Sequence, residues 1–158
     1  MQTAFLNLLD EHQAILHKVC RLYRDTAQDR EDLFQEMVYH LWKAYPSFRG
    51  DSKVSSWMYR IALNTALATF RKREVRIQYQ AVVTTEIPTA EQDDQQEKTN
   101  EMWKAIKQLP AIDKAIVTLY LDELSYRQIG DIIGLSESNV GARLTRIKIK
   151  LRKKLKPA

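Results

Sequence analysis

Apolar residues recur along this chain at the three- and four-residue spacing of amphipathic helices, with almost none of the alternation typical of strands. Such patterns occupy residues 5–23, 33–45 and about 54–73, and Asp29 can cap the second of these helices. Two more follow: one begins at Pro110, suited to a first helical position, and another fills the stretch 124–151. The pattern therefore predicts an all-α fold.

The stretch 124–151 has the signals of two short helices joined by a tight turn. Ser125 can cap the first helix, and Gln128 three residues later completes a capping box. Gly134 stands where a left-handed residue commonly ends a helix, and Ser136 can cap the next one. The apolar positions of that second helix are Val140, Leu144, Ile147 and Leu151. This arrangement is typical of a helix-turn-helix, which binds the DNA major groove, although an ordinary helical hairpin has similar spacing.

Between these patterns lies a segment, residues 77–100, in which the apolar spacing stops. From Glu86 to Glu101 it has six Asp or Glu residues and a single Lys. A segment that buries little apolar area does not recover the entropy lost on ordering. We therefore predict a flexible acidic linker between two small helical domains, 1–76 and 101–158, the second containing the helix-turn-helix.

Charge adds a ligand class to this picture. The 158 residues carry a formal net charge of +5, which favours a polyanionic partner. From Gly141 to Ala158 there are eight Lys or Arg residues and no acid. Because a solvated helix face normally mixes both signs, this run indicates contacts with backbone phosphates.

A second group of cations and aromatic residues lies on or after the third helical pattern. Its members are Trp57, Tyr59, Arg60, Phe70, Arg71, Lys72, Arg73 and Arg76. Aromatic rings stack on unpaired bases while cations follow the backbone, so the group favours single-stranded nucleic acid. The helical spacing of Trp57 and Ile61 equally fits a core position. Asn64, on the same helix, can hydrogen-bond a base edge.

Residues that could support catalysis or bind a metal are few. His17 and Cys20 lie three apart, and Glu36 and His40 lie four apart, but neither pair has further ligands at metal-binding spacing. The chain has no glycine-rich phosphate loop and no nucleophile motif. We expect no catalytic residue, no metal site and no cofactor.

The compartment can be predicted from the cysteine count and the absence of long apolar runs. The single cysteine, Cys20, excludes an internal disulfide framework and fits a reducing cytoplasm. No apolar run approaches the length of a membrane span, and the N-terminus lacks the features of a signal peptide. These features predict a soluble cytoplasmic protein without membrane insertion.

Two separate blocks of this chain resemble one protein family. Residues 32–66, DLFQEMVYHLWKAYPSFRGDSKVSSWMYRIALNTA, closely resemble the second domain of sigma factors of the extracytoplasmic-function group. The Leu109-Pro110 step and the helix-turn-helix resemble the fourth sigma domain, and HQAILHKVCRLY near the start is similar to Bacteroidetes versions. The resemblance covers nearly the whole chain except the linker.

The resemblance implies a bacterial transcription-initiation factor that binds core RNA polymerase and promoter DNA, and it suggests an anti-sigma factor as a further partner. Core binding is implied for Asp32, Gln35 and Glu36, which lie at i, i+3 and i+4 on one helix face. Residues implied at the minus-ten element, including a loop that captures a flipped base, are Phe48, Arg49, Asp51, Ser52, Lys53, Trp57, Tyr59, Arg60 and Asn64. Those implied at the minus-thirty-five element are Ser136, Ser138, Asn139, Gly141, Ala142, Arg143, Thr145, Arg146 and Lys148.

Gly141 departs from the family pattern, in which many members have Lys or Arg there, often followed by Ser. An interior helical glycine costs roughly 1 kcal/mol relative to alanine. Either Gly141 and Ala142 form a smooth patch that approaches bases, or the glycine is a tolerated imperfection. Without a long polar side chain at position 141 to read a base, the shape and deformability of the DNA determine more of the specificity for the minus-thirty-five element.

Two other functional classes remain as alternatives to the sigma factor. A conventional helix-turn-helix regulator would bind duplex DNA without polymerase, and would need a ligand-binding or phosphoacceptor domain in the N-terminal half. A metal-dependent enzyme is the third class, which metal analysis of the purified protein would test.

Overall fold

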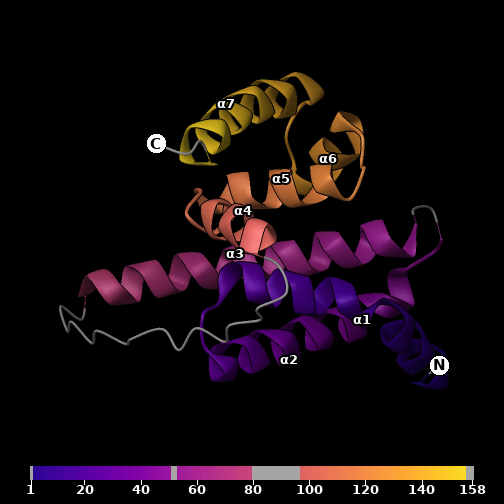
Figure 1. The fold of residues 1–158 in the computed structure, drawn as a ribbon. Coiled ribbons are helices and arrows are strands. Elements are labelled where there is room, and N and C mark those ends of the chain that lie inside the picture. The colour runs from indigo at the N-terminus through magenta and orange to yellow at the C-terminus, as the bar shows by residue number, and fades with distance from the viewer. Residues whose placement is uncertain (1, 51–52, 80–96, 156–158) are drawn as a thin grey trace. The chain divides into compact units, whose positions relative to one another are not determined.

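The computed structural model describes residues 2–50, 53–79 and 97–155, and side chains outside 69–79 and 97–100; all the regular secondary structure in these ranges is helical (Figure 1). The chain divides into two compact units, Met1–Thr89 and Ala90–Ala158. The predicted all-α fold with two helical parts is confirmed. Of the predicted linker, residues 80–96 lie outside the described residues, while its two ends belong to helices. No described helix is long and apolar enough to span a membrane.

The first unit consists of three long helices, α1 (Gln2–Tyr23), α2 (Ala27–Ala44) and α3 (Val54–Tyr79), with a short 3-10 helix, η1 (Tyr45–Ser47), after α2. Each long helix packs against the other two. The largest fully buried side chains are Leu16, Val19, Leu22, Met37, Leu41, Met58 and Leu63. The predicted apolar rows of all three helices therefore supply one core, and α3 continues to Tyr79, beyond its predicted end near residue 73.

The start of α2 differs from the prediction by a few residues. Its N-cap is Thr26, whose Oγ1 accepts a hydrogen bond from the backbone N–H of Asp29 at 3.1 Å. Asp29, which was expected to cap the helix, lies in its first turn, where the helix dipole favours a carboxylate. Threonine and aspartate are both good caps, so local preference alone does not choose between them.

The second unit consists of α4 (Glu97–Lys107), α5 (Ala111–Leu121), α6 (Tyr126–Ile133) and α7 (Glu137–Leu155). Helix α7 packs on each of the other three. The core side chains include Ile106, Leu109, Ile116, Leu119, Ile129, Val140, Leu144, Ile147 and Leu151. Pro110 takes the cap position of α5, so this helix begins one residue later than the sequence predicted.

The single cysteine lies in the first core. Cys20 on α1 is 2% exposed. Burial raises the pKa of its thiol from 9.0 to about 11, against the smaller lowering effects of Arg24, Arg30 and Arg21. Only the thiolate attacks electrophiles, so this cysteine is protected both by its low accessibility and by its low ionisation at neutral pH.

We expect a disulfide-exchange reagent at pH 8 to modify Cys20 far more slowly in the folded protein than in urea. The raised pKa also predicts that its contribution to stability is fully present below pH 9 and is lost as the pH rises towards about 11. Reagent absorbance followed with and without urea measures the first effect. Equal rates in both conditions would contradict the burial of this thiol.

Candidate nucleic-acid interface

Helices α6 and α7 form the predicted helix-turn-helix. The Ser125 hydroxyl accepts the backbone N–H of Gln128 at 3.1 Å, and the Gln128 carbonyl oxygen Oε1 accepts that of Ser125 at 2.9 Å. Gly134 ends α6 with a left-handed φ of 85°. The Ser136 hydroxyl accepts the N–H of Asn139 at 3.2 Å and caps α7. The capping box, the turn and the second cap are thus confirmed.

The turn also depends on a glycine that the sequence analysis did not single out. Gly130 is buried in α6, and a Cβ there would overlap the backbone carbonyl of Leu135. The carbonyl oxygen of Gly130 accepts hydrogen bonds from the N–H groups of Gly134 at 2.7 Å and Leu135 at 3.0 Å. The chain therefore folds back so closely that a side chain has no room. In the sequence, this packing role is indicated only by the position of Gly130 as an isolated glycine inside a helical pattern.

Gly141 faces the neighbouring helix. A Cβ at this position would lie 3.4 Å from Cε2 of Tyr126 on α6, which is ordinary van der Waals contact. Gly141 is half-buried, whereas Ala142 beside it is exposed. Because a methyl group would fit at this position, the structure favours the interpretation of Gly141 as a tolerated imperfection, while Ala142 lies on the outer face.

Three cations of α7 have side-chain partners within their own unit. The Nζ of Lys154 donates to Oε1 of Gln108 at 3.0 Å, and the other two cations contact α5. Arg143 Nη1 donates to Oδ1 of Asp113 on α5 at 3.2 Å. The Nζ of Lys148 lies 4.5 Å from the centroid of the Tyr120 ring, also on α5, a cation–π distance. The sequence analysis expected both side chains at DNA, but in the structure both contact α5.

The outer face of α7 carries the other side chains predicted at the minus-thirty-five element. Its exposed members are Ser136, Ser138, Asn139, Ala142, Thr145 and Arg146. The Thr145 hydroxyl donates to the carbonyl of Gly141 at 3.0 Å, and the Ser136 hydroxyl serves as the cap. Side chains of Ser138, Asn139 and Arg146 remain as polar groups directed away from the buried row.

In the first unit, an aromatic cluster surrounds the start of α3. The cluster consists of Phe5, Trp42, Tyr45, Phe48 and Trp57, with successive ring-centroid distances of 5.1 Å (Phe5–Trp42), 5.4 Å (Phe5–Tyr45), 6.5 Å (Tyr45–Trp57) and 4.7 Å (Phe48–Trp57). It joins α1, α2, η1 and α3. Phe48 and Trp57 are half-buried at its edge, so they are held in place and still accessible on one side.

The remaining residues predicted at the minus-ten element divide by exposure. Arg49, Lys53, Arg60 and Asn64 are exposed, and the last two lie one turn apart on α3. Tyr59 is only 4% exposed because it belongs to the α3 face that packs on α1 and α2. Direct contact of its ring with DNA does not fit this burial. The two further residues named for this loop, Asp51 and Ser52, lie outside the described residues.

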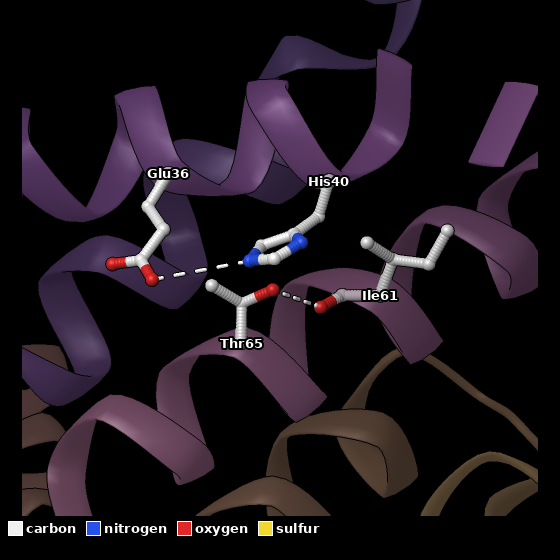
Figure 2. Close-up of polar contacts among 4 residues, drawn as sticks. All are labelled: Glu36, His40, Ile61 and Thr65. Atoms are coloured by element: carbon white, nitrogen blue, oxygen red, sulfur yellow. Dashed lines mark hydrogen bonds and ion pairs between the residues drawn. The ribbon is translucent and has the colours of Figure 1, made fainter. Parts of the chain in front are cut away.

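The three side chains predicted to bind core polymerase, Asp32, Gln35 and Glu36, are all exposed on α2. Glu36 Oε1 lies 3.9 Å from His40 Nε2, and Figure 2 shows both side chains extending from α2 towards the helix that carries Thr65. The Thr65 hydroxyl donates back to the carbonyl of Ile61 at 2.7 Å. Among the residues with described positions, no group of three His, Cys, Asp or Glu side chains is placed to hold a metal ion.

Comparison with known proteins gives two family matches in chain order. The model of Sigma-70 region 2 matches residues 8–76, and that of Sigma-70 region 4 matches residues 99–151. The ECF RNA polymerase sigma factor SigM of Mycobacterium tuberculosis is 29% identical over 149 residues, covering 94% of this chain and 75% of the relative. SigW of Bacillus subtilis, also an ECF sigma factor, is 27% identical, covering 98% and 90%. The chain belongs to the extracytoplasmic-function sigma factors.

This sigma factor is a promoter-specific transcription-initiation factor that acts with RNA polymerase. Region 2 matches residues 8–76, the part of this chain in which a conventional regulator would need a ligand-binding or phosphoacceptor domain. The particular similarity to Bacteroidetes versions stays a prediction.

Solved structures share the fold of this sigma factor. The sigma factor RpoE in complex with the anti-sigma factor NepR from Bartonella quintana has a TM-score of 0.76 and 21% identity, covering 98% of this chain and 95% of that one. CnrH in complex with the cytosolic domain of CnrY has a TM-score of 0.68 and 22% identity, covering 98% and 89%.

Alanine at the two glycines of the helix-turn-helix should have opposite effects on stability. Gly130→Ala should lower the free energy of unfolding by about 1–3 kcal/mol, because the methyl group displaces the turn. Gly141→Ala should raise it by up to about 1 kcal/mol, since alanine favours the helix and the methyl meets Tyr126 at contact distance.

Urea denaturation of the full chain, followed by circular dichroism, compares the two variants with the unchanged protein. The substitution is chemically identical at both sites, so each variant is the control for the other. A greater loss of stability at Gly141 than at Gly130 would contradict the packing described here.

Proposed function

We propose that this sigma factor uses three separate surfaces in promoter opening: the outer face of α2 for core polymerase, the start of α3 for the minus-ten element, and the outer face of α7 for the minus-thirty-five element. The observation that carries the proposal is that these helices bury one apolar row each, while nearly all the implicated polar side chains stay exposed.

The α2 surface suits a protein partner. Asp32, Gln35 and Glu36 are joined by Tyr39, which is 52% exposed and lies one turn after Gln35 and Glu36 on α2. The Nζ of Lys43 lies 4.7 Å from the centroid of the Tyr39 ring, which holds the ring over the surface. Exposed tyrosine among polar residues is typical of protein interfaces, so we add Tyr39 to the residues that bind core polymerase.

The start of α3 suits unpaired bases. Extruding a base costs a few kcal/mol in stacking and pairing, which contacts to the unpaired strand must offset. The half-buried rings of Phe48 and Trp57 offer stacking surfaces, and the exposed side chain of Asn64 offers hydrogen bonds to a base edge. Exposed cations nearby, Arg49, Lys53 and Arg60, suit the backbone. We do not retain Tyr59 as a DNA contact; its place in the core makes it a support for this surface.

The outer face of α7 suits duplex DNA. Ser138, Asn139 and Ala142 lie in its first turns, which a helix-turn-helix presents to base edges. Arg146 is exposed one turn further on and suits a phosphate. Serine and asparagine offer hydrogen bonds to base edges, and alanine offers contact with a thymine methyl.

These roles require binding energy and no bond cleavage by the sigma factor. We propose that it has no catalytic activity, that it acts in the cytoplasm, and that strand opening is driven by capture of unpaired bases. Because the sigma factor RpoE, which has the same fold, is solved in complex with the anti-sigma factor NepR, we also propose regulation of this chain by an anti-sigma factor.

The central test is run-off transcription with core RNA polymerase on a library of DNA fragments carrying randomised upstream and downstream elements. We expect defined transcripts only when this sigma factor is added, and enrichment of particular sequences at both elements. If the protein binds DNA but no transcript depends on its addition, the proposal is wrong.

Two amide-to-alanine substitutions on exposed helix faces should separate the first two surfaces. Gln35→Ala should weaken binding to core polymerase severalfold while leaving opening normal at saturating protein, because its side chain lies on the α2 face. Asn64→Ala should leave core affinity unchanged and reduce opening by about tenfold, because it removes a contact made only with an unpaired base.

Fluorescence anisotropy measures core binding, and 2-aminopurine placed in the minus-ten element reports opening. The variants are matched in exposure and chemistry, so each serves as the control for the other. The same loss in both assays for either variant would contradict this division of roles.

A further inference from the structure

The contact between Arg143 on α7 and Asp113 on α5 joins two residues that are thirty positions apart in sequence. Asp113 lies in the first turn of α5, with a side chain that is 11% exposed. Arg143 lies on α7 with a side chain that is 40% exposed, and its Nη1 is 3.2 Å from Oδ1 of the carboxylate. The acid is thus largely withdrawn from water, whereas the arginine that pairs with it stays partly exposed.

Separating Arg143 from Asp113 is unfavourable because the carboxylate of Asp113 is largely buried. A largely buried carboxylate that loses its charged partner is left with an unpaired charge in a poorly hydrated place, which is strongly unfavourable. To bind a DNA phosphate through its guanidinium group, Arg143 would have to break its ion pair with Asp113. The ion pair therefore opposes the phosphate contact that the basic run of α7 suggested for this residue.

Helix α5 holds α7 at a second point as well. Lys148 contacts the ring of Tyr120, which lies two helical turns after Asp113 on α5. On α7 the two cations flank the buried row that contains Val140, Leu144 and Ile147, one on each side of it. Contacts on both flanks of a buried row resist rotation of a helix about its own axis.

We infer that Arg143 is a positioning residue whose ion pair with Asp113 fixes the rotation of α7, and thereby determines which base edges the helix can read. The inference rests on the proposed reading of the minus-thirty-five element by α7. A small rotation of α7 would leave its cations near the phosphates but would misplace Ser138, Asn139 and Ala142. Loss of the ion pair therefore reduces discrimination between sequences more than it reduces general affinity.

The test uses the full chain assembled with core polymerase, and measures affinity for the selected upstream element and for a scrambled one over a range of salt concentrations. Asp113→Asn keeps the shape of the side chain and removes only its charge. We expect a loss of discrimination of about tenfold, the value of one well-placed base contact, with little change in salt dependence. Were Arg143 a phosphate contact, releasing it from the acid would instead strengthen binding to both sequences and steepen the salt dependence.

Arg143→Lys supplies a second variant that keeps the positive charge, with melting temperatures measured for every variant. Its ammonium group still suits a phosphate but does not reproduce the guanidinium contact, so we expect reduced discrimination here too. Arg146→Gln is the matched control, one turn along α7. It should weaken binding to both sequences and lower the salt slope by about 1.

Restoration provides a third measurement. In the double variant Asp113→Asn with Arg143→Gln, two neutral amides can hydrogen-bond across the same gap, and we expect part of the lost discrimination to return. A phosphate contact at position 143 predicts a further loss in place of this recovery, since no cation remains there.

The outcomes separate the two levels of inference. If the unchanged holoenzyme does not discriminate between upstream sequences, the proposed role of α7 fails and the positioning role fails with it. If the unchanged holoenzyme discriminates but Asp113→Asn and Arg143→Lys do so equally well, the positioning role alone is wrong.

Discussion

The second unit depends on the burial of a single row of apolar side chains on α7. Val140, Leu144, Ile147 and Leu151 occupy one face, and α4, α5 and α6 all pack against that helix. Units of this size bury a limited fraction of their surface, so few core positions can be spared for another purpose. Because this row fixes which side of α7 faces inwards, it also fixes which side remains available to a ligand. The same rule applies to α2, where Leu33, Met37 and Leu41 are buried.

The close approach of α6 and α7 follows from the backbone at the turn. Gly130 admits the carbonyl of Leu135, and Gly134 adopts a left-handed conformation that reverses the chain. These two glycines act through different physical limits, one of space and one of dihedral angle. Together they bring Tyr126 on α6 next to Gly141 on α7. Helix α6 thus supports α7 near its N-terminal end, the end that would meet DNA.

Most features determined by neighbours in sequence could be predicted, except the Thr26 cap of α2 and the close packing of Gly130 on Leu135, whereas features determined by distant residues could not. The caps at Ser125 and Ser136 and the turn at Gly134 involve groups within three or four residues, and all were anticipated. The burial of Tyr59 depends on how α3 meets two other helices, and an amphipathic side chain gives no local sign of its direction. Most of the predicted site residues with described side chains are exposed, and their roles stay predictions. The partners of Arg143 and Lys148 depend on α5, which no spacing rule within α7 can indicate.

The cations of α7 therefore do not form one uniform surface. Attraction of a protein to DNA depends on summed charge, and a pair formed with Asp113 changes that sum only locally. Recognition of a sequence depends on where a few uncharged side chains stand relative to the base edges. A cation placed on the flank of the helix serves the second requirement better by binding α5 than by binding a phosphate. The basic run from Gly141 onwards thus combines two kinds of residue that composition alone cannot separate: those that attract the polyanion, and those that orient the surface that reads it.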